Sequence, residues 1–156
     1  MRAIGQRLRP LDWEPRTAGA TRYVADVDLP GTLVGRVLRS PHPHARILSI
    51  DPAPARALPG VVAVLTAADL PDRRYKHEGP RFADRPPLAR DVVRFVGQEV
   101  AVVAAESAPQ AAAALAAIRV RYQRLPEVTT IEAALAPGAP RLHDRAAAGP
   151  ASSTVP

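Results

Sequence analysis

Arg39-Ser40-Pro41-His42-Pro43-His44-Ala45-Arg46-Ile47 is the stretch of this chain in which two histidines, two prolines and two arginines meet within nine residues. It lies between the apolar runs Leu33–Leu38 and Ile47–Ile50, both of which have the composition of β-strands. Loops that join strands are where binding residues concentrate. Two interpretations are open: His42 and His44 are metal or catalytic groups, or the stretch is a rigid corner between two core strands.

The composition of the chain excludes several kinds of chemistry. A length of 156 residues fits one domain with a tail and suffices to bury a core. The absence of cysteine excludes disulfides, thiol catalysis, iron–sulfur ligation and cysteine-based zinc sites. The N-terminus lacks the apolar core of a signal peptide, and no apolar run is long enough to span a membrane. We therefore expect a cytoplasmic protein without a membrane partner.

The positive charge of the chain suggests nucleic acid as a partner, but the distribution of that charge argues against it. The net charge is +6, and Lys76 is the only lysine among 21 basic residues. The arginines are scattered along the chain among 15 acidic residues. Arg73-Arg74 is the only adjacent pair, and no aromatic stacking platform accompanies it. Nucleic acid is therefore disfavoured as a partner.

Hydrophobic patterning predicts several short strands separated by short helices. Period-two alternation and β-branched runs predict the strands Tyr23–Asp28, Thr32–Arg39, Ala45–Ile50, Val61–Leu65, Val92–Val96, Glu99–Ala105 and Ile118–Arg124. Thr32–Arg39, Val61–Leu65 and Glu99–Ala105 are expected to be buried, and Ile118–Arg124 to lie near a sheet edge. Capping residues predict helices at Asp51–Leu58, Ser107–Ala117 and Thr129–Leu135, and a helical turn at Thr66–Asp69.

These elements predict an α+β fold, with a mixed sheet and two to three short helices, rather than regular βαβ alternation. The expected organisation is an extended arm at 1–20, a domain at 21–144 and a flexible, low-complexity tail at 145–156. Residues 71–90 are rich in proline and charge, and no regular element is predicted there. A loop of that length in a compact domain is usually functional or disordered.

The residues do not assemble a complete catalytic or metal site. His42 and His44 are two apart, which on a strand places both rings on one face, but no third ligand has a fixed spacing to them. The glycines lack the spacing of a dinucleotide-binding loop, and no Gly-x-Ser-x-Gly elbow occurs. We therefore predict neither catalytic residues nor metal ligands in this chain, and the corner interpretation is favoured.

Several motifs in a fixed order carry a resemblance to a known family. They are Gly19-Ala20-x-x-Tyr23-x-x-Asp26, Leu29-Pro30-Gly31-x-Leu33, Arg39-Ser40-Pro41-His42-x-His44-Ala45-Arg46-Ile47, Leu58-Pro59-Gly60-Val61, Pro87-Leu88-Ala89-x-Asp91, Phe95-Val96-Gly97-Gln98 and Val120-x-Tyr122-x-x-Leu125-Pro126. The ordered set resembles the N-terminal a/b hammerhead domain of the molybdopterin-binding subunit of the xanthine dehydrogenase, aldehyde oxidase and carbon monoxide dehydrogenase family. The similarity spans roughly residues 4–143.

The resemblance implies an a/b hammerhead fold and a role beside a catalytic partner. In that family a much larger part binds molybdopterin and carries the catalytic glutamate, and electrons pass to iron–sulfur and FAD centres. The enzymes hydroxylate a carbon of an aldehyde or N-heterocycle. This chain contains no segment that matches the cofactor-binding part. The resemblance thus implies a non-catalytic docking subunit or fragment that binds no cofactor alone and packs on a molybdopterin-binding large subunit.

Two sets of residues follow from the resemblance. The loop Tyr75–Leu88 resembles the family segment near the substrate channel, so Pro80, Arg81 and Phe82 are expected to reach toward that channel, unless the loop is only a surface excursion. The second set is a structural corner, in which Pro43 replaces the alanine frequent in the family; its residues are Arg39, Ser40, Pro41, His42, His44 and Arg46. The alternative function is a free-standing module on the same scaffold that binds a small ligand or nucleic acid.

Overall fold

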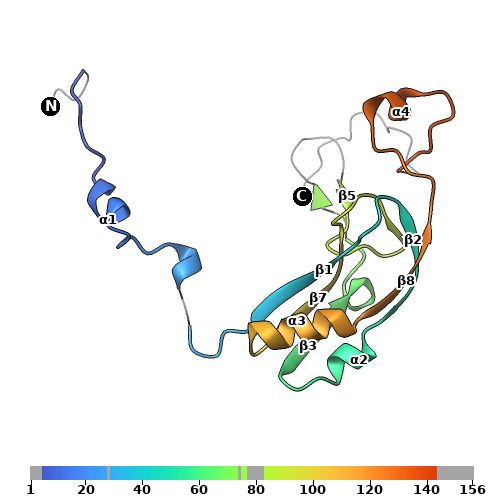
Figure 1. The fold of residues 1–156 in the computed structure, drawn as a ribbon, viewed down its shortest axis with the longest axis horizontal. Helices are drawn as coiled ribbons and strands as arrows, with labels where there is room; N and C mark the ends of the chain where they lie inside the picture. The colour runs from blue at the N-terminus through green and yellow to red at the C-terminus, as the bar shows by residue number, and fades with distance from the viewer. Residues whose placement is uncertain (1–4, 28, 74, 77–82, 144–156) are drawn as a thin grey trace, which may run out of the picture. The chain divides into compact units, whose positions relative to one another are not determined.

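The computed structural model describes residues 5–27, 29–73, 75–76 and 83–143. The chain divides into two units, Met1–Thr32 and Leu33–Pro156 (Figure 1). The first unit contains the short helix α1 (Trp13–Thr17) and the 3-10 turn η1 (Val24–Asp26). The strand predicted from Tyr23 is therefore wrong. The Asp26 carboxylate accepts the Tyr23 amide at 2.9 Å, which bends the backbone into a turn.

The larger unit is built around a three-stranded sheet that we call sheet A. Its strands are β1 (Val34–Arg39), β7 (Glu99–Ala105) and β3 (Val61–Thr66), in the order β1-β7-β3. The helices α2 (Ala53–Arg56) and α3 (Ala108–Ala117) pack on the same face of this sheet. Their contact residues are largely alanines, whose small side chains let a helix approach a sheet closely.

A second three-stranded sheet, sheet B, packs beside the first. Its order is β6-β2-β8, with strands β6 (Val92–Val93), β2 (Ala45–Asp51) and β8 (Arg119–Arg124). The predicted edge position of the last strand is confirmed, since β8 pairs with β2 alone. The core of this sheet is a smaller cluster of fully buried residues, namely Ala45, Ala89, Val93 and Val100.

The remaining elements refine the predictions. β4 (Tyr75–Lys76) and β5 (Ala83–Arg85) form a two-stranded ribbon inside the stretch for which no element is predicted. The last helix, α4 (Ile131–Leu135), is capped by Thr130 and not by Thr129. Among the described residues, no helix is long and apolar enough to cross a membrane.

The strand pairs explain the architecture. Every pair in the described chain is antiparallel, so the strands form separate antiparallel sheets instead of one mixed sheet. Parallel neighbours need a crossover of about a dozen residues or more, and most connections here are shorter. The α+β class is confirmed. β7 is buried as predicted, whereas β1 and β3 are partly exposed, because the helices cover only one face of sheet A.

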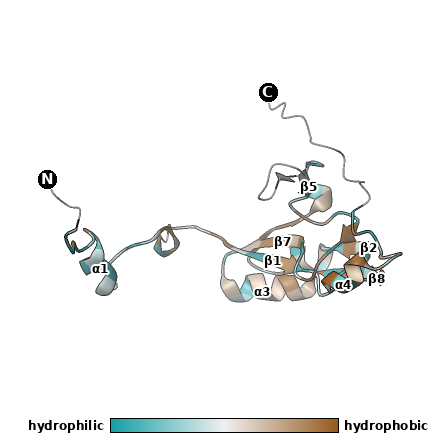
Figure 2. Ribbon diagram, turned by 90° about the horizontal axis from the view of Figure 1, so that it is seen from above, coloured by the Kyte–Doolittle hydropathy of each residue, from teal (hydrophilic) through white to brown (hydrophobic). Residues whose placement is uncertain are grey.

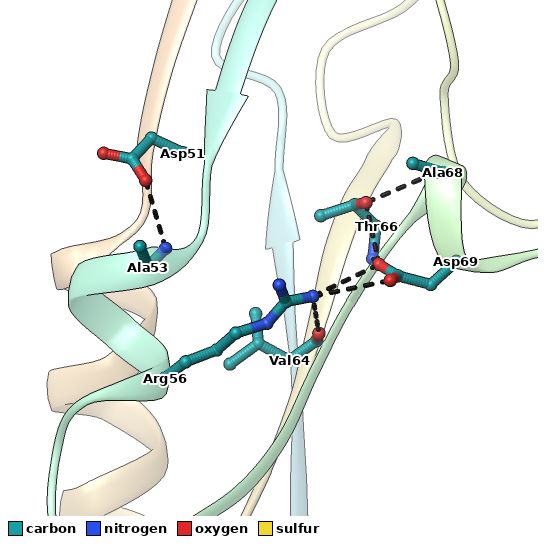
Figure 3. Close-up of polar contacts among 7 residues, drawn as sticks. All are labelled: Asp51, Ala53, Arg56, Val64, Thr66, Ala68 and Asp69. Atoms are coloured by element: carbon teal, nitrogen blue, oxygen red, sulfur yellow. Dashed lines mark hydrogen bonds and ion pairs between the residues drawn. The ribbon is translucent and has the colours of Figure 1, made fainter.

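A polar cluster ties α2 to the end of β3 (Figure 3). The Asp69 carboxylate accepts the Thr66 amide at 2.7 Å and the Thr66 hydroxyl at 2.9 Å, which completes the predicted capping box. Arg56 donates to the Val64 carbonyl at 2.9 Å and lies 3.4 Å from Asp69. The backbone and hydroxyl of Thr66, and to a smaller extent Arg56, lower the pKa of Asp69 below its ordinary value of 3.8.

This cluster predicts a specific response to acid. Because the pKa of Asp69 is lower in the folded state, its ionised carboxylate stabilises the fold above pH 3.8. This stabilisation is lost as the pH falls through the folded-state pKa. We expect Asp69→Asn to lower the urea midpoint at pH 6, and the difference from wild type to shrink toward pH 3. A constant difference between pH 6 and pH 3 would contradict the role assigned to the ionised carboxylate.

Two glycines allow a matched test of backbone strain. Gly60 has a φ of +75°, and a Cβ built there would overlap the Gln110 side chain, which the Ser107 hydroxyl holds at 2.7 Å. Gly35 lacks a positive φ, and its added Cβ would meet open space. We expect Gly60→Ala to cost about 1–3 kcal/mol. Gly35→Ala should raise the stability by up to about 1 kcal/mol. Equal unfolding free energies for both variants would refute this assignment.

Candidate functional site at the corner and the adjoining cleft

The corner between β1 and β2 is closed by a buried serine. Ser40 is only 2% exposed, and its hydroxyl both accepts from the His42 amide and donates to the His42 carbonyl, each at 3.0 Å. The Ser40 backbone is held on both sides, since its amide donates to the Gln98 carbonyl and its carbonyl accepts from the Gly97 amide. The sequence thus folds into a tight turn here, fixed to the segment before β7.

The two histidines of the corner have different partners. His44 is buried, and its Nδ1 lies 2.6 Å from the Pro126 carbonyl, while its own carbonyl accepts the Leu125 amide at 3.0 Å. His42 meets Tyr122 edge-on with ring centroids 5.0 Å apart. Burial raises the pKa of Tyr122, and Ser40 partly opposes that shift. Within the described part of the chain, no group of three or more metal-ligating side chains occurs.

The arginines of the corner also separate. Arg39 lies at a bulge of sheet A, where it donates to the Gly97 carbonyl and to the Glu99 carboxylate, both at 2.8 Å. Burial alone would raise the pKa of Glu99, but hydrogen bonds from its own backbone and from Arg39, with the charges of Arg39 and Arg85, lower it. Arg46 is exposed on β2 and pairs in register with Gln123. Pro41 is exposed at the turn.

A cleft of about 390 Å³ adjoins the corner. Its lining residues are Arg85, Arg94, Phe95, Gln98, Leu142 and His143. Gln98 is only 6% exposed, and its Oε1 accepts the Arg94 amide at 2.7 Å. The Arg94 Nε donates to the Leu142 carbonyl at 2.6 Å, which attaches the C-terminal segment to the cleft wall. The Arg85 guanidinium lies 5.0 Å from the Phe95 ring centre.

The cleft offers binding groups without a catalytic set. The described residues of its walls supply two guanidinium groups, an imidazole, an aromatic ring and a carboxamide, but no hydroxyl nucleophile and no carboxylate base. Such a surface suits an anionic or aromatic group. Sequence reasoning missed this site, because its residues come from segments far apart in the chain. The only signal was Phe95-Val96-Gly97-Gln98, which we used solely as a family motif.

The structure leaves the predicted channel residues untested. Pro80, Arg81 and Phe82 lie outside the described residues. Arg85, the last residue of the neighbouring strand β5, does line the cleft. The loop Tyr75–Leu88 is therefore anchored next to the cleft at its second half, and its role near a substrate channel stays a prediction. The structural role of the corner residues likewise stays a prediction, which their observed contacts support.

Comparison with known proteins gives a consistent result. The family model described as "Aldehyde oxidase and xanthine dehydrogenase, a/b hammerhead domain" matches residues 18–126. A probable xanthine dehydrogenase subunit from Bacillus subtilis is 42% identical over 138 residues, which cover 88% of this chain and 18% of that protein. The carbon monoxide dehydrogenase large chain of Afipia carboxidovorans is 46% identical over 130 residues, covering 82% of this chain and 16% of that protein.

Solved structures agree with the sequence relatives. Reconstituted CO dehydrogenase from Oligotropha carboxidovorans superposes with a TM-score of 0.79 at 41% identity, over 87% of this chain and 17% of that chain. Quinoline 2-oxidoreductase from Pseudomonas putida 86 gives a TM-score of 0.71 at 46% identity, over 78% of this chain and 16% of that chain. The chain thus spans less than a fifth of the length of these relatives. It belongs to the family of aldehyde oxidase and xanthine dehydrogenase a/b hammerhead domains.

Proposed function

We propose that this chain is a non-catalytic structural and docking part of a molybdenum hydroxylase, which packs on a molybdopterin-binding large subunit and helps to shape its substrate channel. The observation that carries the proposal is the coverage of the matches. More than four-fifths of this chain matches the sequence relatives, yet the match takes up only 16–18% of each of them. The remainder of the relatives' length is where a cofactor-binding part would lie.

The described residues do not fit a molybdenum centre. They contain no group of three metal-ligating side chains, and the cleft presents cations and a carboxamide instead of a ligand set. In the proposal the molybdopterin therefore belongs to the large-subunit partner, and the iron–sulfur and FAD centres belong to further subunits. No step of the reaction is assigned to residues of this chain. A cytoplasmic location stays a prediction from the sequence.

The cleft supports the part of the proposal that concerns the substrate channel. Arg85 and Phe95 both line the cleft, and Arg85 ends the strand β5, which follows Pro80, Arg81 and Phe82 in the sequence. A cation stacked near an aromatic ring can guide an anionic or aromatic group across a protein surface. We propose that this loop and the cleft wall face the substrate channel of the assembled enzyme.

The same cleft favours the alternative function, a free-standing binding module. Two arginines and an aromatic ring could bind a small anionic ligand or the backbone of a nucleic acid without any partner subunit. Binding of single-stranded or duplex DNA to the purified chain, with affinity falling steeply as salt rises, would favour the nucleic-acid form of this alternative. Titration with small anions would test the other form.

The proposed function predicts dependence on a partner. The purified chain should contain no molybdenum or iron by mass spectrometry, show no visible absorption, and not oxidise aldehydes or N-heterocycles. Co-expression with the Bacillus subtilis relative, from which the matching segment is deleted, should restore hydroxylase activity. The segment of the relative itself, supplied separately, is the positive control. Restoration by the control but not by this chain would contradict the proposed function.

We expect substitution of either corner histidine to lower the free energy of unfolding by the same amount with and without added metal. His44→Ala removes the partner of the Pro126 carbonyl from a buried position and should cost about 1–3 kcal/mol. His42→Ala removes only the edge contact with Tyr122 and should cost about 0.5–1.5 kcal/mol. Urea unfolding with and without added Zn²⁺ checks both values. Stabilisation of wild type by Zn²⁺ that both variants lose would instead establish a metal site.

A further inference from the structure

Sheet A has one covered face and one face that no described helix covers. The side chains of Ala101, Val103 and Ala105 on β7 are fully buried against α2 and α3. Side chains alternate between the two faces of a strand, so Val102 and Ala104 point away from those helices. Both are only half-buried, although β7 is the central strand. Figure 2 shows α3 along one side of β1 and β7.

The strand register defines an apolar patch on the uncovered face. Val37 and Leu65 flank Val102 in one row, and Gly35 and Ala63 flank Ala104 in the next. We call these six residues the bare patch. It contains no polar side chain, and Leu65 is 41% exposed at its edge. An uncovered apolar surface of this kind marks an interaction site on a stable protein.

The exposed face of sheet B has a different character. Arg46, Arg119 and Arg121 are exposed on the two neighbouring strands β2 and β8. Arg119 is opposite Asp51, and Arg121 is opposite Ser49. A charged face of that kind is suited to water. The two faces therefore differ in charge, because sheet B exposes these arginines whereas the uncovered face of sheet A has no charged side chain at Gly35, Val37, Ala63, Leu65, Val102 or Ala104.

Gly35 indicates how closely another segment could approach the uncovered face of sheet A. It lies inside β1, has no positive φ, and a Cβ added to it would meet nothing within 4 Å. Among the described residues, therefore, neither a turn nor crowding requires glycine at this position. Glycine inside a strand often marks the close approach of another backbone. Ala63 and Ala104 extend the same flat row across the sheet.

We propose that the bare patch is the surface against which the remainder of the large subunit packs, with an apolar segment lying directly over Gly35. The inference rests on the proposed function. The occupant follows from length, because more than four-fifths of each relative lies outside the segment that this chain matches. In these relatives that body and the matching segment belong to one chain, and an apolar, uncharged face is suited to a neighbour of the same chemistry.

A bulky residue at Gly35 tests the proposal without disturbing the isolated chain. Gly35→Trp should keep or raise the urea midpoint, because the added atoms enter open space. It should weaken binding to the co-expressed Bacillus subtilis relative, from which the matching segment is deleted, by at least about tenfold. Ser49→Trp, on the exposed face of sheet B, is the matched control and should bind as wild type does. Leu65→Asp is a second variant expected to lose binding.

The outcomes separate the two levels of the proposal. Failure of the wild-type chain to bind, when the relative's own segment binds, contradicts the proposed function. Wild-type binding that Gly35→Trp and Leu65→Asp leave unchanged overturns the bare patch and leaves the proposed function standing. Sedimentation of the purified chain adds a third outcome. A dimer that becomes monomeric in Gly35→Trp would show that a second copy occupies the patch, and would also overturn the proposal.

Discussion

The burial of β7 is the constraint on which the rest of the larger unit depends. This one strand supplies Ala101, Val103 and Ala105 to the core under α2 and α3, and Val100 to the core of sheet B. All four side chains are fully buried. Because β7 pairs with both β1 and β3, a shift of its register would move apolar side chains out of both cores at once. The bulge at Arg39, held by Glu99 and Gly97, fixes that register where the corner begins.

The corner and the cleft are consequences of the same constraint. Gly97 and Gln98 precede β7 directly, and their backbone groups bind Ser40 on the opposite strand end. The side chain of Gln98 then holds Arg94, which in turn holds Leu142. A chain of hydrogen bonds therefore runs from the buried serine of the corner to the wall of the cleft. His44, one of the two histidines that resemble a metal pair in the sequence, binds a backbone carbonyl, which supports the prediction that the corner is structural.

Local sequence patterns predicted the elements that nearby residues specify. They failed where the structure depends on contacts between residues far apart in the sequence. β7 and α3 were identified because an apolar run and an alanine-rich run specify them directly, although Ser107, the predicted cap of α3, donates to the Gln110 side chain and accepts no helix amide. The segment from Tyr23 reads as a strand, but the nearby carboxylate of Asp26 captures its amide. The cleft could not be predicted, since Arg85, Gln98 and Leu142 are far apart in the sequence and only the fold brings them together. Pro80, Arg81 and Phe82 lie outside the described residues, so that prediction rests on family resemblance alone.

β1 and β3 were predicted to be buried but are partly exposed, and both strands place exposed residues on the uncovered face of sheet A. The sequence of β3 is apolar on each face apart from Thr66 at its end, and β1 carries apolar residues on both faces beside Arg36 and Arg39, a pattern close to that of strands covered on both sides. The described chain covers one face with α2 and α3 and leaves Gly35, Val37 and Leu65 on the other. A sequence that specifies two covered faces, in a fold that covers one, is the pattern expected of a domain whose second layer belongs to another body. In the proposed assembly, the large subunit would supply this second layer over the half-buried Val102.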